Sequence, residues 1–317
     1  MKIVAGLGSI DEYERFVEAG ADEFFCGYVP YSWSKKYGTV LPLNRREVLC
    51  YNVQIGSFSE LEILAAMVRK YRKPVHLTFN SLYYIPEQYP EIAEIIQRCM
   101  ALGFRSYIIA DPALMVYLHE HNIECDIHIS GETGEINSQM MAAFAKFHPK
   151  RLIFHRKNTF EDMEKVIENS ESKLGEFEAF VLNELCQFTG AFCNSLHCDE
   201  MGYLCRVPYI LGGREGNKTE INLKISSGKI EDEIDDSAYL CGETGCGLCA
   251  LYQLQKAGIT HLKLVGRGNY VDYMENDIRS LKRALNILDQ SQSEADFITK
   301  MRSHLFPDGC SKNCYYV

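Results

Sequence analysis

Short apolar runs alternate with amphipathic stretches along the first 184 residues. Each run is almost wholly apolar, and a polar turn separates it from the helical pattern that follows, which is typical of parallel strands covered by helices. Seven such runs are predicted to be strands: Ile3–Leu7, Glu23–Val29, Val75–Asn80, Ser106–Asp111, Cys125–Ser130, Leu152–Arg156 and Phe177–Glu184.

Helix boundary signals support this alternation. Ser9 with Glu12, and Ser57 with Glu60, have the spacing of capping boxes. Gly20 and Gly103 stand where a helix would end just before the next strand.

The alternation of apolar runs and amphipathic stretches stops after the seventh strand and then resumes. Residues 185–245 hold a cysteine cluster and a polar stretch that predicts a small β-rich excursion. A helical pattern at 248–257, an eighth strand at 261–267 and a long helix from about 270 to 288 follow. Eight βα units predict an α/β fold, a (β/α)8 barrel over residues 1–291 that includes the cysteine-rich insertion 185–245, with a C-terminal tail at 292–317. A doubly wound open sheet is the alternative.

The predicted topology also predicts where chemistry takes place. Active sites of such barrels lie where strands end and βα loops begin. Cys186 follows the seventh strand by two residues, so we expect the insertion to lie over the carboxyl-terminal mouth. The alternative is a loop stabilised by zinc without a catalytic role.

Composition narrows the setting. The chain has 317 residues, of which 46% are hydrophobic, and a net charge of −10. No stretch approaches the ~20 apolar residues of a membrane helix, and the amino terminus lacks a secretory pattern, so we expect a cytoplasmic protein without membrane contact. The acidic balance disfavours extended nucleic-acid binding but leaves a local basic groove open.

Thirteen cysteines are unusual for such a protein. In a reducing cytoplasm they indicate metal or redox chemistry rather than disulfides. Cys26, Cys50, Cys99 and Cys125 are scattered and are expected to be small buried apolar residues. The rest are crowded between Cys186 and Cys249 or lie at Cys310 and Cys314. Their irregular spacing favours an iron–sulfur cluster over zinc, whose sites combine compact pairs, although Cys241-x4-Cys246-x2-Cys249 also has the spacing of plant-type ferredoxins.

Several segments together resemble one known family. The run EAFVLNELCQFTGAFCNS at 178–195 resembles the signature of the collagenase-like peptidase family U32, with Asn183 at a position where the family usually has glycine. AGLGSIDEYERFVEAGADEFFCG near the start resembles its opening strand and helix, and VHLTFNSL its strand ending in asparagine. CGLCALYQLQKAGITHLKLVGR resembles its final helix and strand.

The resemblance implies a 4Fe-4S cluster. Motif matching assigns its ligands to Cys186, Cys193, Cys205 and Cys246, with Cys198 as a competing third ligand. A candidate second metal site, for another cluster or a zinc ion, consists of Cys241, Cys249, Cys310 and Cys314 if the tail folds back to the mouth; the alternative is a flexible, reduced tail.

The resemblance also implies a reaction, because some relatives support oxygen-independent hydroxylation of a quinone precursor or an RNA pyrimidine. We therefore expect oxidation or hydroxylation of a small aromatic or nucleobase-like substrate. The alternative is a peptidase, or a binding module with a structural cluster or zinc. A small-molecule substrate or electron donor is the expected partner, and a related chain could form a heterodimer.

Polar residues at strand ends are the substrate-binding candidates. Asn80 and Arg267 match the family's asparagine and arginine, and a guanidinium can hold a carboxylate or phosphate through two hydrogen bonds. His155 lies at the end of the sixth predicted strand. Each residue also has a structural alternative. Asn80 would hold adjacent loops together by amide hydrogen bonds, Arg267 would form an ion pair at the rim of the barrel, and His155 would be a buried core histidine. The sequence carries no recognisable hydrolytic motif, so the catalytic residues stay unassigned.

Overall fold

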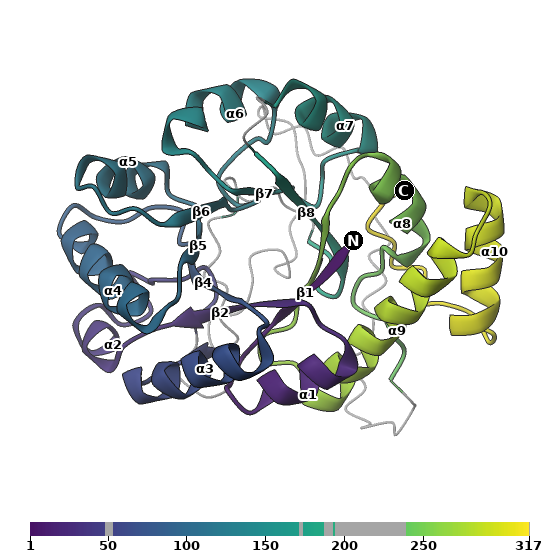
Figure 1. Ribbon diagram of the computed structural model, residues 1–317, viewed down its shortest axis with the longest axis horizontal. Coiled ribbons are helices and arrows are strands. Elements are labelled where there is room, and N and C mark those ends of the chain that lie inside the picture. The colour runs from purple at the N-terminus through teal and green to yellow at the C-terminus, as the bar shows by residue number, and fades with distance from the viewer. Residues whose placement is uncertain (48–52, 171–173, 187–192, 194–238, 317) are drawn as a thin grey trace, which may run out of the picture.

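Eight parallel strands close into a barrel surrounded by helices (Figure 1). The computed structural model describes residues 1–47, 53–170, 174–186, 193 and 239–316. The strands are β1 (Lys2–Gly6), β2 (Glu23–Tyr28), β3 (Gln54–Ile55), β4 (Val75–Phe79), β5 (Ser106–Ile109), β6 (Asp126–Ile129), β7 (Arg151–Ile153), β8 (Glu176–Leu182) and β9 (His261–Leu264). The ring runs β1-β2-β4-β5-β6-β7-β8-β9 and returns to β1, while β3 pairs with the end of β2 outside the ring.

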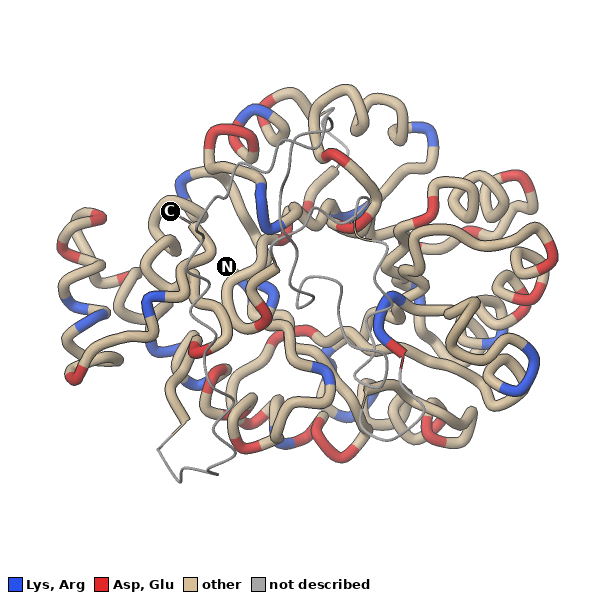
Figure 2. The backbone as a smooth tube through the Cα atoms, turned by 180° about the vertical axis from the view of Figure 1, so that it is seen from behind, with Lys and Arg blue, Asp and Glu red and all other residues tan. Residues whose placement is uncertain are grey.

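Helices cover the outside of this ring. They are α1 (Glu12–Ala19), α2 (Tyr31–Tyr37), α3 (Phe58–Tyr71), α4 (Gln88–Leu102), α5 (Pro112–Glu120), α6 (Ser138–Phe144), η1 (Ala145–Phe147), α7 (Phe160–Asn169), η4 (Leu248–Ala250), α8 (Leu251–Lys256), α9 (Val271–Asp289) and α10 (Glu294–Leu305). Figure 2 shows acidic and basic residues interspersed around this helical shell. The eight predicted strands and the barrel are confirmed.

The boundary predictions have mixed outcomes. Ser57 and Glu60 form the expected capping box of α3, and Gly20 and Gly103 end α1 and α4 with positive φ. The box predicted for Ser9 and Glu12 is wrong, because α1 begins only at Glu12. The Glu12 carboxylate instead accepts a hydrogen bond from the Gly8 amide at 2.7 Å. The predicted β-rich excursion falls almost entirely outside the described residues.

The chain after α9 contains structure that the sequence did not predict. Residues 292–317 were set apart as a tail, but α10 forms within them and packs beside α9 (Figure 1). The chain then folds back, and Tyr315 joins an apolar cluster with Phe25 and Phe180. That cluster is separate from the core between strands and helices. Apart from Tyr315, its residues come from strands, at positions that alternate with those of the outer core, so the cluster fills the barrel interior.

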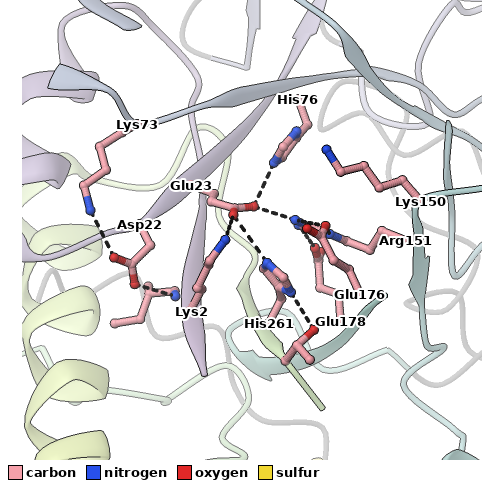
Figure 3. Close-up of polar contacts among 12 residues, drawn as sticks. Lys2, Asp22, Glu23, Lys73, His76, Lys150, Arg151, Glu176, Glu178 and His261 are labelled. Carbon is pink, nitrogen blue, oxygen red and sulfur yellow. Dashed lines mark hydrogen bonds and ion pairs between the residues drawn. The ribbon is translucent and has the colours of Figure 1, made fainter. Parts of the chain in front are cut away.

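A charged network fills the amino-terminal half of the barrel interior (Figure 3). Glu23 accepts hydrogen bonds from His76 at 2.9 Å and from Arg151 at 2.6 Å. Glu178 is fully buried between Arg151 at 2.7 Å and Lys263 at 2.8 Å. Residues at this end of such barrels contribute to stability rather than chemistry.

The network keeps its carboxylates charged. Burial would raise the pKa of Glu23, but hydrogen bonds from His261 and His76 and the charge of Arg151 outweigh it, and the pKa lies well below its ordinary value. Burial lowers the pKa of His76. The network therefore pairs neutral imidazole and charged guanidinium with carboxylate.

Candidate functional site

Arg267 lies across the carboxyl-terminal mouth of the barrel. It follows β9, and 6% of it is exposed. A Cβ on Gly27 would stand 2.9 Å from its Nη1 atom, and a Cβ on Gly6 would stand 3.1 Å from its Cγ atom. The two glycines, on β2 and β1, therefore leave the room that the arginine occupies.

The guanidinium of Arg267 has little compensation for its charge. Its Nη1 atom donates a long hydrogen bond of 3.4 Å to Thr78 Oγ1, and no carboxylate from the described part of the chain pairs with it within 4.0 Å. Burial, and then the charge of Arg46, lower its pKa to about 10. A buried cation with so few partners is suited to bind an anionic ligand group.

The loop that ends at Glu47 contributes a second buried group to this mouth. Glu47 is buried, and its Oε1 atom accepts a hydrogen bond from the Asn44 amide at 2.5 Å. Burial raises its pKa to about 7. Thr78 Oγ1 donates to Asn44 Oδ1 at 2.7 Å, which ties the loop to β4. Glu47 was not predicted from the sequence, although the polar run NRRE between apolar segments was a visible signal.

Two of the predicted cluster ligands lie against this mouth. Arg45 donates a hydrogen bond from Nη2 to the Cys193 carbonyl at 2.8 Å. Cys186 is half-buried. Burial lowers the pKa of Arg156, but Tyr315, Glu132 and then Cys186 outweigh burial and raise it. Arg46 and Glu184 form an ion pair between the loop and the end of β8. Both thiol-bearing residues thus lie within a rim of arginines.

Asn80 and His155 have structural contacts. Asn80 Oδ1 accepts a hydrogen bond from the Arg45 amide at 3.1 Å, which is the loop-tying role considered as its alternative. His155 is buried, and its Nδ1 atom accepts from the Lys157 amide at 3.0 Å. A contact of either residue with substrate stays a prediction.

The remaining predicted ligands fall into different places. Cys246, Cys249, Cys310 and Cys314 line one cavity. Cys241 does not line this cavity and is buried against Asp277 and Ser280. Cys205 and Cys198 are outside the described residues. Within the described ranges, no three histidine, cysteine, aspartate or glutamate side chains already stand at metal-ligating distance.

The model of peptidase family U32 matches residues 8–316. The chain belongs to peptidase family U32. A search of curated proteins found no match to this chain.

Solved structures resemble this U32 chain only weakly. A structure described as the U32 peptidase Mk0906 is 12% identical, with a TM-score of 0.43, and the match covers 57% of this chain and 68% of that one. A structure described as native KDPGal is 10% identical, with a TM-score of 0.45 and coverage of 92% and 97%. The YdjI aldolase from Escherichia coli K12 is 9% identical, with a TM-score of 0.43 and coverage of 96% and 88%. Similarities this weak say nothing about chemistry.

Family membership clarifies Asn183. The U32 signature usually has glycine at this position, and Asn183 has a φ of +68°, in the left-handed region where glycine is favoured and asparagine is tolerated. Its side chain donates a hydrogen bond to Asp277 at 2.7 Å. This U32 chain therefore keeps the turn after β8 with a different residue.

None of the helices in the described ranges is long and apolar enough to cross a membrane.

Gly27 provides a test of anion binding by Arg267. We expect Gly27→Ala to displace the guanidinium and to weaken binding of benzoate or inorganic phosphate roughly 10- to 150-fold, the worth of one hydrogen bond to a charged group. Isothermal titration calorimetry measures this. Gly56→Ala is the matched control, because nothing lies within 4 Å of its added Cβ. Equal affinities in the two variants would contradict the prediction.

Proposed function

We propose that this U32 protein is an iron–sulfur redox enzyme that oxidises or hydroxylates a small aromatic or nucleobase-like substrate without O2. The substrate would bind at the carboxyl-terminal mouth of the barrel. In such a hydroxylation the oxygen atom would come from water, and the electrons that the substrate loses would leave through the cluster to an electron acceptor or to a related chain as partner.

The observation that carries the proposal is the position of Cys186 and Cys193 in the arginine-lined mouth. Thiolates are the ligands of iron–sulfur clusters, and neighbouring guanidinium groups stabilise their charged form. Arg45 contacts the backbone of Cys193, and Arg156 lies within electrostatic reach of Cys186. The family signature implies Cys205 and Cys246 as the further ligands. A cluster bound to these thiolates would supply one-electron transfer.

The chain's own residues suit a substrate with an anionic group. Arg267 could hold a carboxylate or phosphate, since its guanidinium has a single weak hydrogen bond among the described contacts. Glu47, with a pKa raised to about 7 by burial, could accept or release a proton near neutral pH. An oxidation that removes electrons from a substrate also removes protons, so a carboxyl with this pKa is useful in such a site.

Iron binding tests the proposal. Protein purified anaerobically should contain about four irons and four sulfides per chain, and its visible absorption should fall on reduction with dithionite. We expect Cys186→Ser and Cys193→Ser to lose most of that iron, because each removes a ligand. Iron, sulfide and spectral analysis of the full chain measure this.

A distant cysteine provides the matched control for iron binding. Cys125 is half-buried and lies just before β6, outside the family signature. Cys125→Ser should keep its iron. Equal iron loss from Cys125→Ser and Cys186→Ser would contradict the ligand assignment. Peptide cleavage by metal-free protein, with no reducible cluster in the native protein, would favour the peptidase alternative instead.

A further inference from the structure

The C-terminal segment, residues 311–316, lies against two stretches of chain that carry predicted cluster ligands. The first is the ligand turn, residues 183–186, which follows β8 and ends at Cys186. The second is the ligand loop, residues 242–247, which contains Cys246. The chain after α10 returns to the barrel and ends beside α8 (Figure 1). The tail thus folds back, as one of the two sequence-based alternatives proposed.

The ligand turn and the ligand loop pair with each other. The Asn183 amide donates a hydrogen bond to the Gly245 carbonyl at 2.8 Å, and the Leu185 amide donates to the Thr244 carbonyl at 2.8 Å. A Cβ on Gly245 would lie 2.9 Å from the Leu185 amide nitrogen, so glycine permits this close approach. Backbone contacts therefore join the two stretches into one unit.

The C-terminal segment holds the ligand loop through the backbone of Cys246. The Cys246 amide donates to the Asn313 carbonyl at 2.8 Å, and the Tyr315 amide donates to the Cys246 carbonyl at 2.9 Å. Ser311 Oγ donates to the Gly242 carbonyl at 2.9 Å, at the start of the same loop. Both backbone polar groups of Cys246 are thus engaged by the end of the chain.

The side chain of Tyr315 holds the ligand turn. It is buried, and its phenol donates a hydrogen bond to the Asn183 carbonyl. Its ring belongs to the interior cluster with Phe180, and Leu185 packs against that cluster. Burial raises the pKa of Tyr315 well above its ordinary value, so the phenol keeps its proton and remains a donor. One residue therefore contacts both ligand-bearing stretches.

Arg156 lies beside the same phenol. Its guanidinium carbon stands 3.9 Å from the centroid of the Phe180 ring, and the guanidinium is within hydrogen-bonding reach of Tyr315. Its ion pair with Glu132 is long, at 3.5 Å. A positive charge near an iron–sulfur cluster favours the reduced form, because reduction adds negative charge. The orientation of Arg156 would therefore affect the reduction potential of a cluster at this mouth.

We propose that Tyr315 is a positioning residue of the cluster site. Its backbone holds Cys246, and its phenol holds the turn that leads to Cys186 and keeps Arg156 beside it. Supports of this kind fix the geometry of metal ligands and tune the metal. The inference rests on the proposed function for its consequence, the potential of the cluster. The hold on the two ligand-bearing stretches can be measured without any metal.

Hydrogen–deuterium exchange of the metal-free full chain tests the positioning. Amides of the ligand turn should exchange about tenfold faster in Tyr315→Phe than in the native chain, because the Asn183 carbonyl loses its donor. Tyr316→Phe is the matched control, since its phenol donates to the Phe180 carbonyl at 2.7 Å within β8, and its ligand turn should exchange at the native rate. Mass spectrometry of peptides measures this. Native exchange in Tyr315→Phe would overturn the proposal.

Redox titration of anaerobically purified protein gives a readout that a merely structural role would not move. Tyr315→Phe should keep its iron, and its one-electron equilibrium should shift roughly tenfold toward the oxidised form, a potential lower by about 59 mV. Arg156→Gln should lower the potential at least as far. The double variant should lie no lower than Arg156→Gln, because Tyr315 acts on the potential through Arg156.

Two results of the titration would contradict this role of Tyr315: a native potential in Tyr315→Phe, or additive shifts in the double variant. A native chain that binds no cluster would count against the proposed function alone. The exchange measurement on metal-free protein would then still decide whether Tyr315 holds the two stretches.

Discussion

Replacing Glu178 by alanine is expected to destabilise the protein by about 3–5 kcal/mol, the usual cost of removing one partner from a buried ion pair. Glu178 is fully buried and accepts from both Arg151 and Lys263. Without it, Lys263 loses its carboxylate partner, and Arg151 keeps only its contacts with Glu23 and Glu176. Two cations would then share the barrel interior with less negative charge.

Urea unfolding followed by circular dichroism measures the loss. Glu161→Ala is the matched control, because Glu161 pairs with Lys165 on the exposed face of α7, where such pairs contribute about 0–1 kcal/mol. A Glu178→Ala protein within about 1 kcal/mol of the native chain would show that the network is dispensable for stability.

Acid is expected to weaken the same network. Burial alone would raise the pKa of Glu178, but Lys263 and Arg151 outweigh it and lower the pKa to about 2. The unfolded chain binds this proton near pH 4.5, so the carboxylate's stabilising contribution is present above that pH and is lost as the pH falls toward 2. The expected loss from Glu178 is roughly 2 kcal/mol between pH 4 and pH 2.

The free energy of unfolding at several pH values in this range tests the acid prediction. Glu178→Gln should have a shallower dependence on pH than the native protein, since the variant has no carboxyl to protonate. Glu161→Gln should keep the native slope. Burial raises the pKa of both Glu12 and Glu47 to about 7. Both carboxyls are therefore already protonated in the folded protein throughout this acid range. Parallel slopes for the native chain and Glu178→Gln would contradict the assignment.

The strands could be predicted from sequence because parallel barrel strands are buried on both faces. Runs such as Ile3–Leu7 are therefore apolar throughout and easy to recognise. The helix α10 was missed although Ser293 caps it by accepting from the Asp296 amide at 3.2 Å. The buried face of this helix consists of Phe297 and Met301 alone, so its apolar periodicity is too short to stand out from the polar residues around it.

The polar interior and the grouping of cysteines could not be predicted. His76 and Glu23 lie 53 residues apart, and only the closed barrel brings them within 2.9 Å. In the same way, the sequence grouped Cys241 with Cys249, Cys310 and Cys314, whereas Cys246 lines the cavity that holds the other three. Backbone hydrogen bonds of Cys246 with Asn313 and Tyr315 bring the C-terminal segment beside Cys246, and such a long-range pairing is not visible in the sequence.

Barrel closure has a consequence for how the chain folds as it is made. β1 pairs with β2 on one side and with β9 on the other, and β9 begins 259 residues after β1. At a translation rate of 5–20 residues per second, β1 waits roughly 10 to 50 seconds for its second neighbour. During that interval the partly built sheet has open edges, which are templates for pairing with other chains. Nascent chains stalled before residue 261 should therefore depend on chaperones more than released chains do.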